Sequence, residues 1–218
     1  MHPHHGQRVV SVGAPLADSR GVVVMLHGRN AGPDNILDLV PRLNRPKLTY
    51  LAPAAANRSW YPYTFMAERE KNEPFLSSAL ARLDDLIVDL SHRRIDATQI
   101  VVLGFSQGAC LATEFVFRHP RRYGGLIAFT GGLIGPPGAT WDTGGSFDGM
   151  PAFFGCSDVD AHVPIGRVRE STEIFARMAA DVTSRVYAGM GHIVNDDEIR
   201  WARELIDRAF NEQGTTNN

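Results

Sequence analysis

Short apolar runs alternate with amphipathic stretches along most of the chain. Continuous β-branched or aromatic runs are typical of strands buried on both faces, and they occupy residues 21–28, 47–53, 100–105, 124–132 and 151–158. Residues 181–189 alternate between apolar and polar side chains, as a further strand does. Apolar residues recur at helical spacing in residues 33–43, 72–93, 107–120, 164–180 and 195–210. The first of these helices has Asp34 as a candidate N-cap.

Strands and helices therefore alternate, and this order predicts an α/β fold with a mainly parallel central sheet and helices on both faces. The sequence contains no internal repeat and no low-complexity linker. Residues 1–218 are therefore expected to form a single domain, with residues 1–7 as a flexible tail. Ligands of such sheets bind beyond the carboxyl ends of the strands. Polar side chains that directly follow strands are therefore the candidates for chemistry.

The composition narrows the possible partners. With 22 Lys and Arg against 24 Asp and Glu, the net charge is -2, which gives no basis for binding nucleic acid. No run reaches the roughly 18–20 apolar residues of a membrane-spanning helix, and the first residues lack the features of a secretory signal. We therefore expect no stable membrane insertion and a cytoplasmic location. Cys110 and Cys156 form no metal-ligand spacing, and the histidines of "MHPHHG" have no thiol or carboxylate nearby, so no metal site is expected.

The segment "IVVLGFSQGAC" (residues 100–110) contains a G-x-S-x-G motif, with Ser106 between Gly104 and Gly108. It lies between a predicted strand and a predicted helix, which is the setting of a nucleophile elbow. In that turn the glycines avoid collisions that side chains would cause. The alternative is that Ser106 is an ordinary helix N-cap and that the glycines only mark a turn. The flanking strand and helix favour the nucleophile.

A base for a serine nucleophile should be a histidine, because its pKa lies near neutral pH. His192, in "GMGH" between the last strand and the last helix, follows both Ser106 and two acid candidates. This order of Ser, Asp and His is that of α/β-hydrolases. The acid candidates are Asp158 and Asp160, which both follow a strand and could orient the imidazole. One of them could instead stabilise its own loop, and position alone leaves the choice open.

An oxyanion hole needs backbone N–H donors near the nucleophile. One is expected from Gln107, the residue after Ser106, and one from Arg29, in the loop "LHGRNAG" after an early strand. The alternative for His27 and Gly28 is a simple strand end with a buried histidine.

Together, "LHGR", "GFSQGA", "SDVDAHVP" and "GMGH" resemble the motifs of the phospholipase/carboxylesterase family of α/β-hydrolases, over residues 20–210. The resemblance implies a compact domain with little or no lid, serine esterase or acyl-thioesterase activity through an acyl-enzyme intermediate, and no cofactor. The family's spacing from the acid to a following proline selects Asp160, with Pro164, whereas its spacing from a preceding glycine selects Asp158. We take Asp160 as the triad acid. Asn30 departs from the H-G-x-G pattern of the family, so the shape of the oxyanion loop is expected to differ.

The aromatic segment "NRSWYPYTFMAERE" (residues 57–70) corresponds by position to the segment beside the acyl pocket in that family. Trp60, Tyr61 and Phe65 are therefore candidates to line a substrate cleft, and the alternative is packing of a long loop against the core. The expected partner is a small-molecule ester or thioester, and the protein is expected to be a monomer or homodimer. The alternatives on the same fold are a lactone or dienelactone hydrolase and a non-catalytic binding module.

Overall fold

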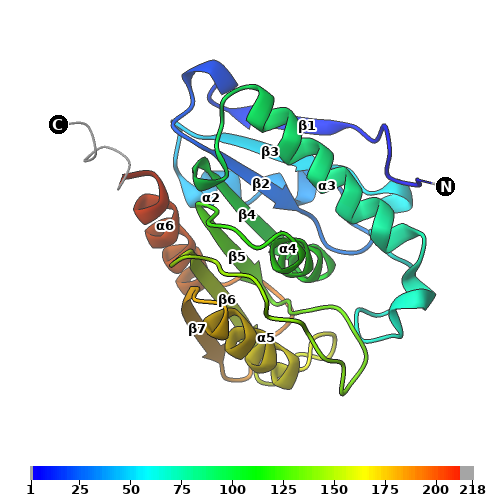
Figure 1. The fold of residues 1–218 in the computed structure, drawn as a ribbon. Helices are drawn as coiled ribbons and strands as arrows, with labels where there is room; N and C mark the ends of the chain where they lie inside the picture. The colour runs from blue at the N-terminus through cyan, green and yellow to red at the C-terminus, as the bar shows by residue number, and fades with distance from the viewer. Residues whose placement is uncertain (1, 212–218) are drawn as a thin grey trace.

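A computed structural model describes residues 2–211 of the chain, and Met1 and residues 212–218 lie outside the described part. Its centre is a seven-stranded sheet with the strand order β1-β3-β2-β4-β5-β6-β7 (Figure 1). The strands are β1 (Val9–Gly13), β2 (Val22–Leu26), β3 (Thr49–Pro53), β4 (Ile100–Phe105), β5 (Gly125–Phe129), β6 (Pro151–Ser157) and β7 (Asp181–Tyr187). Neighbouring strands pair in parallel, except that β1 pairs antiparallel with β3 at the sheet edge. The predicted mainly parallel sheet is confirmed.

Helices cover both faces of this sheet, which is why its inner strands are apolar along their length. On one face lie α3 (Phe75–His92), α4 (Gln107–Arg118) and α5 (Ile165–Arg177), which bury one hydrophobic core and stand in front of the sheet in Figure 1. On the other face lie α1 (Pro33–Leu37), α2 (Val40–Leu43) and α6 (Asp196–Asn211), which bury a second core. Single 3-10 turns occupy Leu16–Asp18, Ala56–Arg58, Arg69–Asn72 and Ala97–Gln99.

Two elements differ from the prediction. The single helix expected over residues 33–43 is two short helices, because Pro41 has no N–H to continue the hydrogen-bond ladder from α1. Gly32, not Asp34, is the N-cap of α1. The edge strand β1 is absent from the prediction, since its half-exposed residues show neither a continuous apolar run nor a clear alternation.

One residue of the N-terminal segment, which was expected to be a flexible tail, packs into the molecule. The His4 side chain is fully buried. Its backbone N–H donates to Oγ of Ser78 at 2.9 Å, and its ring bonds to the segment after β3. These partners lie more than 50 residues away along the chain, so a local pattern could not reveal them.

Candidate active site

Ser106 lies at the sharp turn between β4 and α4, at the carboxyl edge of the sheet. Its backbone has φ 56° and ψ -121°, a strained conformation for a residue other than glycine. The turn is possible because two glycines pack closely. A Cβ on Gly104 would lie 2.3 Å from the carbonyl oxygen of Gly108, and a Cβ on Gly108 would lie 2.1 Å from that of Leu26 in β2. Ser106 is the N-cap residue of α4, but within the described chain its side chain makes no capping bond to the helix.

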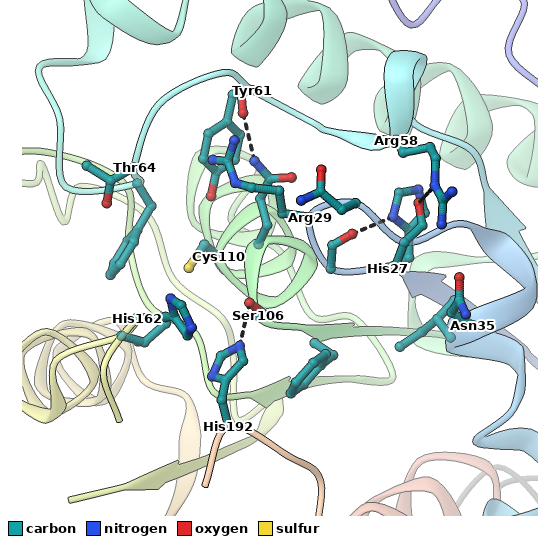
Figure 2. Close-up of a pocket in the computed structure, with 18 of the residues that line it drawn as sticks. His27, Arg29, Asn35, Arg58, Tyr61, Thr64, Ser106, Cys110, His162 and His192 are labelled. Atoms are coloured by element: carbon teal, nitrogen blue, oxygen red, sulfur yellow. Dashed lines mark hydrogen bonds between the residues drawn. The ribbon is translucent and has the colours of Figure 1, made fainter. Parts of the chain in front are cut away.

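Ser106, His192 and Asp160 form a continuous hydrogen-bond relay. Oγ of Ser106 lies 2.8 Å from Nε2 of His192, as Figure 2 shows, and Nδ1 of His192 lies 2.6 Å from Oδ2 of Asp160. A carboxylate can only accept, so Nδ1 carries the ring hydrogen and Nε2 is free to accept the hydroxyl proton. The three residues follow β4, β7 and β6, and parallel strands bring these ends to one edge of the sheet.

Asp160 also orders its own loop. Its Oδ1 accepts from the backbone N–H groups of His162 and Val163, each at 2.8 Å. Burial on its own would raise the pKa of Asp160, but these bonds and the one to His192 hold that pKa below its ordinary value of 3.8. The carboxylate is therefore charged at neutral pH, when it can stabilise a protonated imidazole.

Asp158, the other acid candidate, lies outside the relay. Its Oδ1 accepts from the backbone N–H of Gly189 at 2.8 Å, three residues before His192. Asp158 therefore ties the loop after β6 to the loop that carries the histidine. The geometry places Asp160, and not Asp158, against the imidazole.

The two expected oxyanion donors line the same cleft as Ser106. The Gln107 N–H is in the first turn of α4, where backbone donors have no partner inside the helix. Among residues 2–211, neither this N–H nor that of Arg29 has a hydrogen-bond acceptor. Asn30, which stands where the family often has glycine, has φ 61°, a left-handed conformation that asparagine tolerates.

The side chains of the same two residues hold a loop beside the cleft. Oε1 of Gln107 accepts from the backbone N–H of Trp60 at 3.0 Å, and its Nε2 donates to the carbonyl of Tyr61 at 2.8 Å. The Arg29 guanidinium donates to the carbonyls of residues 62–63. Each residue therefore positions a main-chain N–H near Ser106 and a side chain against residues 60–63.

A cleft of about 680 Å³ opens at Ser106 (Figure 2). Of the three predicted pocket residues, Tyr61 and Phe65 line it. Trp60 does not: it is fully buried, and its indole N–H donates to the carbonyl of His27 at 2.8 Å. The alternative of core packing therefore describes Trp60, whereas Tyr61 and Phe65 belong to the same buried core and also reach the cleft.

Two buried histidines bind the backbone of the loop that follows β3. Nε2 of His27 accepts from the N–H of Ala55 at 3.1 Å, and Nδ1 of His4 accepts from the N–H of Ala56 at 2.9 Å. Their other ring nitrogens bond to backbone carbonyls. A ring that accepts at one nitrogen and donates at the other is neutral, and burial lowers the pKa of both histidines. His27 is therefore a structural residue at the end of its strand.

His162 is a cleft residue to which the sequence analysis gave no role. Its ring is 4.8 Å from that of His192, centroid to centroid, in an edge-to-face arrangement, and both rings line the cleft. Its position two residues after Asp160 is the signal that could have placed it there.

Within residues 2–211, no group of three or more His, Cys, Asp or Glu side chains is placed to hold a metal ion. None of the helices in that range combines the length and the apolar character that a bilayer crossing requires. The thiols of Cys110 and Cys156 are free and buried. Burial raises the pKa of each to about 12, so both stay protonated.

A mainly parallel sheet with a serine elbow after one strand, and an acid and a histidine after two later ones, defines the α/β-hydrolase fold. The sequence profile of the phospholipase/carboxylesterase family matches residues 8–209. The chain belongs to this family.

Individual relatives agree with this assignment. A phospholipase/carboxylesterase from Dyadobacter fermentans, known from its crystal structure, is 41% identical, with a TM-score of 0.88 over 93% of this chain and 97% of that chain. The Bacillus cereus carboxylesterase is 19% identical, with a TM-score of 0.75 over 94% and 96% of the two chains, and shares the fold. Acyl-protein thioesterase 1 of Saccharomyces cerevisiae is 30% identical over 119 residues, which are 53% of this chain and 52% of the yeast protein. The chain spans about half the length of the curated relatives it matches.

Proposed function

We propose that this protein is a serine hydrolase that cleaves carboxylic esters or thioesters. The observation that carries the proposal is the relay from Ser106 through His192 to Asp160, of which Ser106 and His192 line the cleft. Membership of the phospholipase/carboxylesterase family supports it, and so do the names of the relatives, which include carboxylesterases and a thioesterase.

The first half of the reaction transfers the acyl group to the enzyme. Nε2 of His192 takes the proton of Ser106 as Oγ bonds to the carbonyl carbon. The backbone N–H groups of Arg29 and Gln107 donate to the oxyanion of the tetrahedral intermediate. The bond to the leaving oxygen or sulfur then breaks, and His192 gives its proton to that atom. Asp160 stabilises the imidazolium while it exists.

The second half releases the acid. His192 takes a proton from water, whose oxygen bonds to the acyl carbon and displaces Ser106. The serine recovers its proton from the imidazolium, and the enzyme returns to its starting state. The same two N–H donors serve both steps, because the oxyanion forms at the same position each time.

A fluorophosphonate probe tests the proposal, because it forms a covalent bond with an activated serine. We expect one label per chain, located at Ser106 by peptide mass analysis. The variant Ser106→Ala should stay unlabelled, and His192→Ala should lower kcat for p-nitrophenyl butyrate by about 10⁴-fold or more. The control is Ser77→Ala, which removes an exposed serine on α3 and should label as the wild type does. A folded wild-type chain without a label at Ser106 contradicts the proposal.

A graded panel of p-nitrophenyl esters and acyl thioesters then separates the two leaving groups. The ratio of kcat/KM for an ester and a thioester of the same acyl chain states the preference directly, because the acyl contacts are shared.

A further inference from the structure

The cleft at Ser106 carries charge of one sign. Among the described residues its lining contains Arg29 and Arg58 but no aspartate or glutamate, although the whole chain has slightly more acidic than basic residues. Asp160 is not on this lining, and its carboxylate faces His192 and two backbone N–H groups. A cleft lined by cationic groups concentrates anionic ligands.

Arg58 is the cleft arginine that has no fixed partner. Within residues 2–211 its guanidinium makes no ion pair, and its Nε reaches only the carbonyl of Ala31, at 3.5 Å, which is a long hydrogen bond. Arg29, by contrast, is occupied by the carbonyls of residues 62–63. The charge of Arg58 reaches the cleft wall, where it adds to burial in lowering the pKa of His27.

Two asparagine side chains line the same cleft. Oδ1 of Asn35 accepts from the backbone N–H of Gly32 at 2.9 Å, which leaves its NH₂ group as a donor. Asn30 is the second amide on the lining. Figure 2 shows Arg58 and Asn35 together beyond His27, on the side of the cleft away from His162. A guanidinium with amide donors beside it suits a carboxylate or a phosphate.

The backbone fixes Arg58 relative to the oxyanion loop. Asn57 and Arg58 both have left-handed conformations, with φ 52° and 59°, and such conformations persist only where the surroundings impose them. The carbonyl of Arg58 accepts from the N–H of Asn30 at 2.8 Å, next to Arg29. An anion held by Arg58 would therefore lie beside the loop that supplies a proposed oxyanion donor.

We propose that Arg58, with the amides of Asn30 and Asn35, is a subsite for a second, anionic group of the substrate. The preferred substrates are then esters or thioesters that also carry a carboxylate or a phosphate. This inference rests on the proposed hydrolase function and names the substrate class of the same site.

Paired substrates test the inference, with hydrolysis followed by pH-stat. On the acyl side the pair is monoethyl adipate and ethyl hexanoate, and on the alcohol side it is 4-acetoxybutanoate and pentyl acetate. A further ester carries a phosphate group in place of the free carboxylate. For at least one pair we expect kcat/KM to be about 10–100-fold higher for the anionic member, which is the contribution expected from hydrogen bonds to a charged group. This preference should decrease with added NaCl, because salt screens the charges.

Two variants and a control locate the effect. Arg58→Gln should reduce the preference to a few-fold or less. Asn35→Asp keeps an acceptor for the N–H of Gly32 but places a negative charge in the subsite, so it should abolish or reverse the preference. The control Arg93→Gln removes the same charge from an exposed residue at the end of α3 and should leave the preference unchanged.

Equal turnover of both members of each pair by the wild type overturns the inference and leaves the hydrolase proposal intact. The same conclusion follows if Arg58→Gln and Asn35→Asp both keep the wild-type preference. A wild type that hydrolyses none of the compounds and takes no fluorophosphonate label contradicts the hydrolase proposal itself.

Discussion

Asp158 and Asp160 are two residues apart, but their carboxylates have different partners. Asp160 contacts Nδ1 of His192 at 2.6 Å, and Asp158 accepts from the N–H of Gly189 at 2.8 Å. In Asp160→Asn the amide can donate to Nδ1, which then becomes the acceptor and leaves the hydrogen on Nε2. An imidazole in that state cannot take the proton of Ser106, and we expect kcat for p-nitrophenyl butyrate to fall by about 10³–10⁴-fold.

Asp158→Asn is the matched control for this change. Its amide oxygen can still accept from the N–H of Gly189, so we expect kcat to stay within about tenfold of the wild type. Both variants are compared at pH 7.5, after circular dichroism has shown that they fold. A large loss in Asp158→Asn together with a small loss in Asp160→Asn would reverse the assignment of the triad acid.

The role of a single residue was predictable from the sequence where that role depends on its neighbours along the chain. Ser106 needs glycine on both sides in a tight turn, and that requirement is visible in the motif. The acid has no such requirement, because its partner His192 is 32 residues away and two different spacings were satisfied. Trp60 could not be told from Tyr61, since both are aromatic, adjacent and buried, and only the path of the loop brings Tyr61 and not Trp60 to the cleft.

Hydrogen bonds from His4 connect the N-terminal segment to the loop after β3. The His4 ring bridges the N–H of Ala56 and the carbonyl of Trp60, at 2.9 and 3.0 Å. The variant His4→Ala leaves both backbone groups buried without a partner, and we expect it to lower the free energy of unfolding by about 2–4 kcal/mol in urea titrations. The control is His5→Ala, which changes an exposed histidine and should cost less than about 0.5 kcal/mol. Equal effects of the two variants would contradict a bridging role for His4.

The contribution of His4 should depend on pH. Burial lowers its pKa in the folded protein below the ordinary value of 6.5. The neutral ring therefore stabilises the fold fully above pH 6.5, and this contribution is lost as the pH falls through the folded-state pKa. We expect the difference in unfolding free energy between the wild type and His4→Ala to be largest above pH 6.5 and to shrink in acid. A difference that grows toward low pH would contradict this.

Elements were predictable where their own residues determine them. The inner strands and the long helices follow from continuous apolar runs and helical spacing, and β4 has the bounds that its sequence predicts. The edge strand β1 was missed because it forms through pairing with β3 and its side chains are only partly buried or exposed. The burial of His4 was missed for a related reason. Its neighbours in the sequence are mostly polar, and it is buried because it contacts Trp60 and Ser78, which are distant along the chain.

Across the whole molecule, the parallel topology assembles the candidate site. Ser106 and His192 are 86 residues apart in the chain but in hydrogen-bond contact, because β4 and β7 end at the same edge of one sheet. The order of the motifs was therefore sufficient to predict which side chains meet. The charge of the cleft was not predictable in this way, because it depends on which arginines the loops turn inward.

A buried carboxyl group couples α6 to the sheet beneath it. Glu198 is fully buried, and its Oε2 accepts from the N–H of Asn195 at 2.9 Å. Its Oε1 has no partner among the described residues and lies 2.2 Å from the position that a Cβ on Gly155 in β6 would take. Burial raises the pKa of Glu198 to about 7, although the bond to Asn195 and the charge of Arg42 act in the opposite direction and Asp197 adds a smaller rise.

This raised pKa makes global stability sensitive to pH in the direction opposite to His4. The unfolded carboxyl group ionises near 4.5, so the folded state loses stability as the pH rises from about 4.5 to about 7. At about 1.4 kcal/mol per pKa unit the loss is about 3 kcal/mol. Glu198→Gln replaces the protonated acid by a neutral amide of the same shape. We expect it to unfold with the same free energy as the wild type near pH 4.5 and to be more stable by up to about 3 kcal/mol at pH 8.

Urea titrations at half-unit pH intervals measure this difference, and Glu173→Gln on the exposed face of α5 is the control that should follow the wild-type curve. If Glu198→Gln also follows that curve, the buried carboxyl group is not the source of the pH dependence. If it is less stable than the wild type at pH 8, the result contradicts a destabilising charge on Glu198 as the source of the pH dependence.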